Sequence, residues 1–412
     1  MTVLRQFFAA ALLLLALAPP LPARAGGEIV LGMSAAFSGP TRGLGIELYR
    51  GAQACFAGVN AAGGVHGRTI AIRALDDRYA PDPAIENAIT FAEQGDVFAL
   101  FGQVGTPTAT RVLPLLRRYQ GRGLYLLFPL TGAEPLRQPP YDRWVFNLRA
   151  SYAQEARGLV DNFVRQGRTR IAVLHQADAY GRAGWDGVRK ALARFDLAIA
   201  AEASHARSAG PDADMGPQVD IIAQGHPDAV VAVGSSEACA AFVRHARDKG
   251  LDVPVAVLSF AGAEHLTALL LRAGKAAGRD YTADLVLSQA VPSHADPALP
   301  AGAAYHQAME RFAPPPPATL VGDDYEPLPY SLASFEGYLA ARLFVEALRR
   351  MGPDPHPRML PEAMRGLAGF DLGVGEPVGF GPASNQALSR VHFVAVEQGR
   401  LVPVKDFARW RK

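Results

Sequence analysis

A short threonine-rich turn, Gly105-Thr106-Pro107-Thr108, has residue types that could bind an anion. It follows the apolar run Val97–Phe101, which predicts a buried parallel strand. Thr106 can cap a helix and Pro107 suits its first turn, so the pattern predicts a tight strand-to-helix connection. In an open α/β sheet, ligands bind at such turns, and the free N–H groups of the turn favour a carboxylate. An ordinary capped turn is the alternative interpretation.

Residue patterns that would support catalysis are missing from the rest of the sequence. The histidines lack the HExxH and HxH spacings of zinc sites. Gly234–Ala238 lacks the second glycine of a nucleophile elbow, and its hydroxyls are expected to cap the next helix. Gly43-Leu44-Gly45 lacks the third glycine of a dinucleotide motif. The acidic pairs Asp76-Asp77 and Asp323-Asp324 are typical of solvated turns. We therefore expect no enzyme, no metal site and no cofactor.

The first 25 residues have the design of a secretory signal peptide. Arg5 precedes the apolar run Phe7–Ala18, and the small residues of Ala23-Arg24-Ala25 suit cleavage before Gly26. The run is shorter than the ~20 apolar residues of a membrane span, and no later segment is longer. The sequence predicts an exported, periplasmic protein that is not embedded in a membrane.

Length and charge narrow the class further. A chain of 412 residues predicts more than one domain, because single cores rarely exceed about 300 residues. The net charge of +2 indicates no nucleic-acid partner. The two cysteines, Cys55 and Cys239, are expected to be small buried thiols inside helices.

Apolar strands alternate with amphipathic helices along most of the chain, which predicts an α/β fold with two doubly wound parallel-sheet lobes. A (β/α)₈ barrel is the alternative that this pattern leaves open. Strands are expected near 29–33, 69–74, 97–101, 124–128, 170–174, 197–201, 229–233, 253–258, 285–291 and 390–396, and helices near 46–60, 82–94, 152–166, 214–224, 236–249, 301–311 and 334–351.

A set of short motifs gives the sequence a family likeness from about Glu28 to Val404. They are Phe37-Ser38-Gly39-Pro40, Val59–Arg68, Asp76-Asp77, Phe101-Gly102, Asp178-Ala179-Tyr180-Gly181 and Pro227–Val231. Together they resemble the leucine/isoleucine/valine-binding family of periplasmic substrate-binding proteins of ABC importers. The resemblance implies a type I periplasmic binding protein fold, with two lobes joined by a three-crossing hinge that close over a small-molecule ligand. It also implies membrane permease and ATPase subunits as partners. Placed on this chain, lobe 1 is 27–148 and 289–375, and lobe 2 is 149–288 and 385–405.

The resemblance also implies several ligand-binding residues. Thr106, with the backbone of Gly105, matches a residue that holds the ligand carboxylate. Pro129-Leu130-Thr131-Gly132 matches a second carboxylate-holding loop. Tyr180 matches an aromatic residue that closes over the ligand from lobe 2, and Tyr330 falls where another aromatic wall is common.

Three positions depart from the family pattern and bear on specificity. Leu44 and Ser235 stand where aromatic residues are expected, and Phe260 stands where an acid pairs with the ammonium group of an amino acid. Without that acid, burying an ammonium group unpaired would cost several kcal/mol. We therefore expect a small carboxylate or amide with an apolar body, with Arg42 as a further contact. The predicted function is an exported solute-binding protein. A ligand-sensing module of the same fold is the alternative, and a hydrolase a weaker one.

Overall fold

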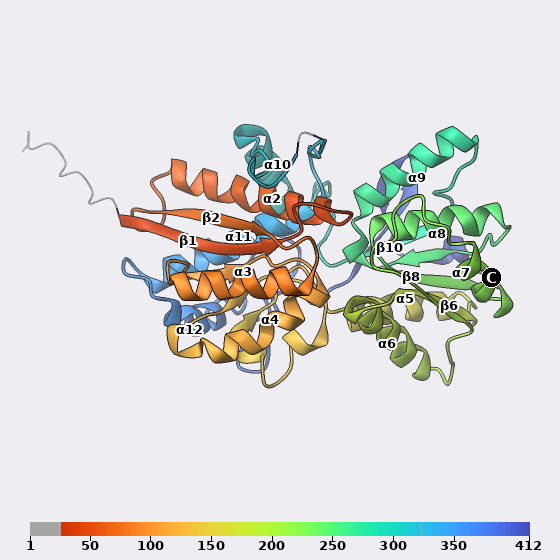
Figure 1. Ribbon diagram of the computed structural model, residues 1–412, viewed down its shortest axis with the longest axis horizontal. Helices are drawn as coiled ribbons and strands as arrows, with labels where there is room; N and C mark the ends of the chain where they lie inside the picture. Colours follow the sequence, from red (N-terminus) through yellow and green to blue (C-terminus); the bar gives the residue numbers. More distant parts are fainter. Residues whose placement is uncertain (1–25, 323) are drawn as a thin grey trace, which may run out of the picture.

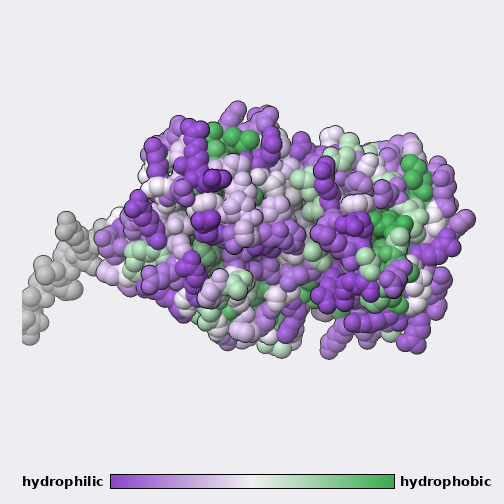
Figure 2. All heavy atoms as spheres, turned by 90° about the horizontal axis from the view of Figure 1, so that it is seen from below, coloured by the Kyte–Doolittle hydropathy of each residue, from purple (hydrophilic) through white to green (hydrophobic). Residues whose placement is uncertain are grey.

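The computed structural model describes residues 26–322 and 324–412, which form two α/β lobes side by side. The predicted signal peptide and its cleavage site at residues 1–25 lie outside the described residues. The chain passes from the first lobe to the second, returns to the first, and ends in the second lobe, where the C-terminus lies (Figure 1). Side chains on the face drawn in Figure 2 are mostly hydrophilic, with small apolar groups scattered over both lobes.

The first lobe contains a five-stranded parallel sheet in the order β2-β1-β3-β4-β5. Its strands are β1 (Gly26–Ala35), β2 (Arg68–Asp76), β3 (Ala99–Phe101), β4 (Leu126–Leu127) and β5 (Val145–Phe146). All three residues of β3 are buried, as expected for a central parallel strand. In this doubly wound order the strand sequence reverses between β1 and β3, and ligands bind at such switch points.

The second lobe contains a seven-stranded sheet in the order β12-β11-β10-β9-β8-β6-β7. Its strands are β6 (Ile171–Gln176), β7 (Glu202–His205), β8 (Ala229–Val233), β9 (Val255–Val257), β10 (Leu285–Gln289), β11 (His392–Glu397) and β12 (Arg400–Pro403). Strands β6 to β10 are parallel, and the β11–β12 hairpin adds two antiparallel strands. A second switch point therefore lies between β6 and β8. Two separate open sheets exclude the barrel alternative.

Helices cover both sheets. The first lobe has α2 (Arg42–Ala61), α3 (Pro81–Gln94), α4 (Thr106–Arg118), α10 (Pro300–Phe312), α11 (Leu332–Met351) and α12 (Leu360–Arg365). The second lobe has α5 (Tyr152–Arg165), α6 (Ala179–Ala193), α7 (Gly216–Gln224), α8 (Ser236–Asp248) and α9 (Ala263–Ala277). In the described part of the chain, no helix combines the length and apolar character that a membrane crossing requires. Cys55 and Cys239 are buried free thiols inside α2 and α8, as predicted.

One expected strand does not form, and some elements were not predicted. The strand expected at 197–201 does not form, and the chain pairs with β6 further on, at Glu202–His205. The strand expected near 390–396 forms as β11, and β12, which was not predicted, pairs with it as a hairpin. Helix α9 was not predicted, although Gly262 and Gly278 mark its two ends.

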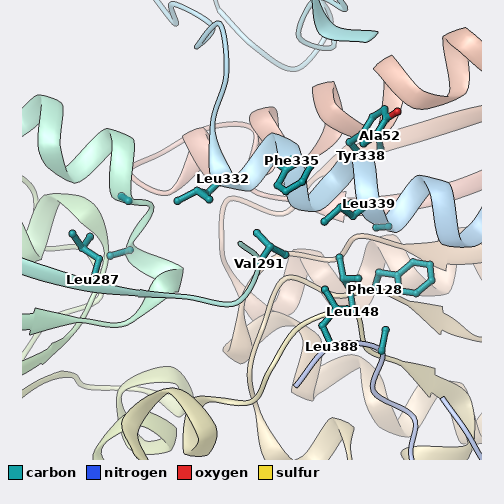
Figure 3. Close-up of a cluster of buried hydrophobic side chains, with 14 of the residues drawn as sticks. Ala52, Phe128, Leu148, Leu287, Val291, Leu332, Phe335, Tyr338, Leu339 and Leu388 are labelled. Atoms are coloured by element: carbon teal, nitrogen blue, oxygen red, sulfur yellow. The ribbon is translucent and has the colours of Figure 1, made fainter. Parts of the chain in front are cut away.

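The chain crosses between the lobes three times, and these crossings are packed together. Leu148, Val291 and Leu388 each lie on a different crossing and are at most 1% exposed. Figure 3 shows these three side chains next to one another, between Leu287 of the second lobe and helix α11 of the first. The first and third crossings are also joined by a backbone hydrogen bond from Leu388 N to Leu148 O, 2.8 Å. The hinge is therefore an apolar core in itself.

The exact ends of the lobes stay a prediction. The backbone of Asn147 accepts a hydrogen bond from Ala387 N and donates one to Asn385 O. We propose on this ground that residues 385–387 belong with lobe 1, so that the second piece of lobe 2 is 388–405 instead of 385–405. The other predicted boundaries are unchanged: lobe 1 is 27–148 and 289–375, and the first piece of lobe 2 is 149–288.

Helices α2 and α11 cross at a point where two glycines allow backbone contact. A Cβ atom at Gly51 would lie 1.7 Å from Ser334 O, and one at Gly337 would lie 2.1 Å from Leu48 O. Such overlap involves backbone that cannot swing aside, so the two helices would have to separate.

We expect Gly51→Ala to lower the free energy of unfolding by about 3 kcal/mol or more, at the upper end of overpacking effects. Gly58→Ala is the matched control in the same helix, because its Cβ would meet only the side chain of Phe312, at 3.3 Å. The control should stay within about 1 kcal/mol of wild type, the range of helix propensity. Denaturant unfolding measures both, and equal stability of the two variants would contradict the close-packed crossing.

Candidate ligand-binding site

A cavity of about 450 Å³ lies between the lobes, next to both switch points. The first lobe contributes Gly39–Leu44 and Tyr325, and the second contributes Pro211, Ser235, Ser236, Glu237, Phe260, Ala261, His265 and Leu269. Arg42, Leu44, Ser235 and Phe260, which the sequence singled out, thus come together here. Tyr325, Glu237 and His265 line the same cavity and were not predicted.

Two helices from opposite lobes begin at this cavity. Arg42 is the first residue of α2, which starts earlier than the expected residue 46 and places Arg42 and Leu44 in a helical turn instead of a loop. On the other side Ser235 caps α8, its Oγ accepting a hydrogen bond from Ala238 N, 3.2 Å. Helix N-termini carry partial positive charge. The two ends therefore favour an anionic group in the cavity.

Charged side chains of opposite sign stand on the two walls. Arg42 Nη1 pairs with Asp324 Oδ2 at 2.8 Å, and its guanidinium lies 5.6 Å from the ring centre of Tyr325. Glu237, on the α8 wall, accepts a hydrogen bond from Ser236 Oγ at 2.9 Å. Burial raises the pKa of Glu237 above its usual value and lowers the pKa of His265, which favours the neutral imidazole.

Deeper between the lobes, hydroxyl groups gather at the end of β3. Thr106 Oγ1 lies 2.7 Å from Thr131 Oγ1 and 3.5 Å from Tyr152 Oη, and all three residues are buried. The expected cap is not formed: Gly105 caps α4 with a φ of 104°, and no side chain accepts a hydrogen bond from the N–H groups at the start of this helix. The Thr106 hydroxyl is therefore free to face Thr131. A side chain at Gly105 would collide with the ring of Tyr79, 2.3 Å away.

Aromatic rings separate these hydroxyls from the cavity. The ring centre of Tyr180 lies 5.0 Å from that of Tyr152 and 4.8 Å from that of Phe260. Tyr79 is a second ring neighbour of Phe260, with a distance of 5.7 Å between the ring centres. The Tyr180 hydroxyl is buried without a hydrogen-bond partner among the described residues. The structure thus arranges the predicted residues in two layers, with Phe260 belonging to both.

Tyr330 does not join either layer. Its hydroxyl donates to Glu310 Oε1 at 2.5 Å, and its ring lies 4.3 Å from that of His306. Ser331 caps α11 immediately afterwards, so Tyr330 packs against α10, away from the cleft. Tyr325 is the aromatic residue that this segment places in the cavity.

The pair Asp76-Asp77 is not a solvated turn. Asp77 is fully buried and accepts hydrogen bonds from Ser34 Oγ and from Tyr79 N, both at 2.9 Å. These bonds hold Tyr79 in a left-handed backbone conformation, φ 58°, with its ring against Phe260. Burial raises the pKa of Asp77 to about 7. An acidic pair at the end of a β-strand was the only sequence signal that Asp77 supports Tyr79.

A buried polar network connects the lobes behind the aromatic rings. Arg149, on the first crossing, places Nε 3.2 Å from Glu336 Oε1 of α11 and donates from Nη2 to Ser259 Oγ, 2.6 Å. Ser259 in turn donates to Glu155 of α5 from both its backbone N and its Oγ, at 2.9 Å. None of these residues was predicted, because their meeting requires both lobes.

The family model described as periplasmic binding protein matches residues 28–400. A possible leucine/isoleucine/valine-binding protein from Rhodopirellula baltica has a similar structure, with a TM-score of 0.80, 29% identity, and coverage of 94% of this chain and 98% of that one. A branched chain amino acid ABC transporter protein from Thermus thermophilus with bound valine shares the fold, with a TM-score of 0.78, 19% identity, and coverage of 93% and 98%. The Leu/Ile/Val-binding protein homolog 3 of Brucella melitensis is 25% identical over 166 residues, 40% of this chain and 44% of that protein. The match thus spans less than half the length of that relative.

The raised pKa of Asp77 predicts that stability falls as pH rises from about 4 to about 7, since in this window the folded state keeps a proton that the unfolded state has lost. Glu264, whose pKa burial also raises to about 7, acts in the same window. In Asp77→Asn the free energy of unfolding should depend less on pH, by an amount on the order of a few kcal/mol between pH 4 and 7. Denaturant unfolding at several pH values measures this. Asp76→Asn is the adjacent control, and an unchanged slope in Asp77→Asn would contradict the prediction.

Proposed function

The chain belongs to the periplasmic binding protein family, a family of solute-binding proteins and not of enzymes, and we propose that it captures a small organic ligand between its lobes for an ABC importer. The observation that carries the proposal is the cavity of about 450 Å³ whose walls come from both lobes. A ligand held there contacts both lobes at once, and its binding energy favours the closed arrangement.

The lining supports a carboxylate or amide with an apolar body as the ligand. Leu44, Phe260 and Leu269 supply apolar walls. The N-terminal ends of α2 and α8, together with Arg42, suit a carboxylate. Thr106 and Thr131 remain proposed as a deeper carboxylate cradle, which a ligand reaches only if it displaces the long contact between Thr106 and Tyr152.

Delivery to a membrane permease and its ATPase is part of the same proposal, as is a periplasmic location after export. The support for both is the family membership and the names of the relatives. The permease would recognise the closed, ligand-bound lobes.

Narrowing the cavity should block the ligand. We expect Leu269→Trp to weaken binding by about 10-fold or more, because the larger ring occupies the apolar volume that the ligand fills. Leu271→Trp is the matched control: Leu271 lies on the same helix, is 40% exposed and does not line this cavity. A thermal-shift screen of branched-chain amino acids and short carboxylates identifies a ligand, and calorimetry then compares the variants. Equal affinity of Leu269→Trp and wild type would refute the assignment of the cavity.

The cradle has its own test. Thr106→Val should cost about 1 kcal/mol of stability through the lost hydrogen bond to Thr131 and should weaken binding of a carboxylate ligand by about 10-fold. Thr110→Val is the control on the same helix, since its hydroxyl bonds only to the backbone at Thr106 O. Unchanged affinity in Thr106→Val would remove the hydroxyl pair from the site and leave the outer cavity alone.

A further inference from the structure

Helix α9 borders two cavities. His265 and Leu269 line the ligand cavity, whereas Thr267, Ala268 and Leu271 line a second cavity of about 580 Å³. With 3.6 residues per turn, these two sets lie on different faces of the helix. We propose that the second cavity is a separate binding site for a small uncharged molecule that has an apolar body and one hydroxyl or amide group. It goes beyond the proposed function, because its lining shares no residue with the ligand cavity.

The walls of the second cavity come from both lobes. Lobe 2 supplies α9 and the β11–β12 hairpin, and lobe 1 supplies the segments 293–295 and 329–332. Its volume lies within the range of about 300–1,000 Å³ that is common for small-molecule sites. The larger apolar side chains of its lining are Leu271, Pro329, Tyr330, Leu332, Val394 and Leu401. An apolar body in the cavity would remove this surface from water and would contact both lobes at once.

Thr267 indicates where the polar group of such a molecule would bind. The residue is only 5% exposed, and in residues 26–322 and 324–412 its hydroxyl has no hydrogen-bond partner. A threonine inside a helix can donate to the carbonyl group four residues earlier, as Thr108 and Thr110 of α4 do, at 2.6 and 2.7 Å. Thr267 forms no such bond. Because a buried hydroxyl without a partner is unfavourable, a hydrogen-bonding group in the cavity would stabilise it.

Glu264 lies one helical turn before Thr267 and lines the same cavity. Its Oε1 accepts a hydrogen bond from Leu332 N of the other lobe, at 2.8 Å. No Lys or Arg of the described residues is close enough to lower the pKa of Glu264, and burial raises this pKa to about 7. Its carboxyl group is therefore partly protonated near neutral pH. A hydroxyl or amide, which both donates and accepts, suits Glu264 in either protonation state.

His294 is the other side chain of the lining that could compete for the polar group. Its Nδ1 lies 2.9 Å from His306 Nε2, so this nitrogen already has a partner. The free hydrogen-bonding capacity of the cavity therefore lies at the α9 wall, with Thr267 and Glu264, and the apolar body of the ligand is expected to lie toward Tyr330 and Leu401.

The test uses three probes that share the toluene skeleton: 4-methylphenol, toluene, which lacks the hydroxyl, and 4-methylbenzylamine, which carries a charge. Ligand-observed NMR titrations of the mature chain measure the dissociation constants. Wild type should bind 4-methylphenol about 3- to 10-fold more tightly than toluene, the range expected for one hydrogen bond between neutral groups. Thr267→Val should lose this preference and keep the affinity for toluene, because valine has the same shape without the hydroxyl.

Two neighbouring substitutions distinguish the two cavities. Ala268→Trp should abolish binding of 4-methylphenol by filling the second cavity, whereas Leu269→Trp, which narrows the ligand cavity, should leave it unchanged. The melting temperature of Thr267→Val should equal or exceed that of wild type, because the substitution removes an unpaired hydroxyl. A clear fall would show that the hydroxyl already has a partner in the protein, and would overturn the assignment.

Four binding results would also overturn the second site. They are no binding of 4-methylphenol to wild type, equal affinity for 4-methylphenol and toluene, tighter binding of 4-methylbenzylamine than of 4-methylphenol, and loss of 4-methylphenol binding in Leu269→Trp but not in Ala268→Trp. The proposed function has a separate criterion: it fails if the wider screen finds no ligand whose affinity Leu269→Trp weakens. The two proposals can therefore fail independently.

Discussion

The buried guanidinium of Arg149 imposes the strictest constraint on how the two lobes meet. A charge taken out of water is tolerated only where its partners are well placed, and removing one partner of such a pair typically costs about 3–5 kcal/mol. Here the partners come from both lobes: Glu336 of α11 in lobe 1 pairs with Nε, and Ser259 of lobe 2, which itself bonds to Glu155, accepts from Nη2. The lobes therefore cannot shift relative to one another without loss of these bonds. Around this network the three crossings pack as an apolar core (Figure 3).

That constraint determines where the cavity between the lobes lies. With the hinge set, the switch points of the two sheets face each other, and the helices that begin there, α2 and α8, point their N-termini into one space. The two lobes thus supply charges of opposite sign, Arg42 and Glu237, to opposite walls.

The aromatic layer of Tyr152, Tyr180 and Phe260 gives the site its depth. These rings are almost fully buried, and the ring centre of Tyr180 lies 5.0 Å from that of Tyr152 and 4.8 Å from that of Phe260. They keep water from the pair Thr106 and Thr131, where a hydrogen bond is worth more than at the surface because the local dielectric is low. The two hydroxyls therefore lie behind the rings and do not line the outer cavity.

Much of this architecture follows from local sequence patterns. The apolar run Ala229–Val233 forms β8 within the expected bounds, and alternating strands and helices predicted two doubly wound sheets, because periodicity and turn residues act over short distances. The prediction that Thr106 caps the helix was wrong, because Gly105 is the cap residue and the Thr106 hydroxyl bonds to Thr131.

Tyr325 and Tyr330 look equivalent in sequence, and only their packing, against the cleft or against α10, distinguishes them. Likewise β7 forms at Glu202 instead of Leu197 because its register depends on β6, a partner distant in the chain. The sequence by itself determined the fold class and the turn at Thr106. The identity of the cleft residues, Glu237 and Tyr325 above all, was decided by the tertiary structure, because their contacts join segments that no local pattern relates.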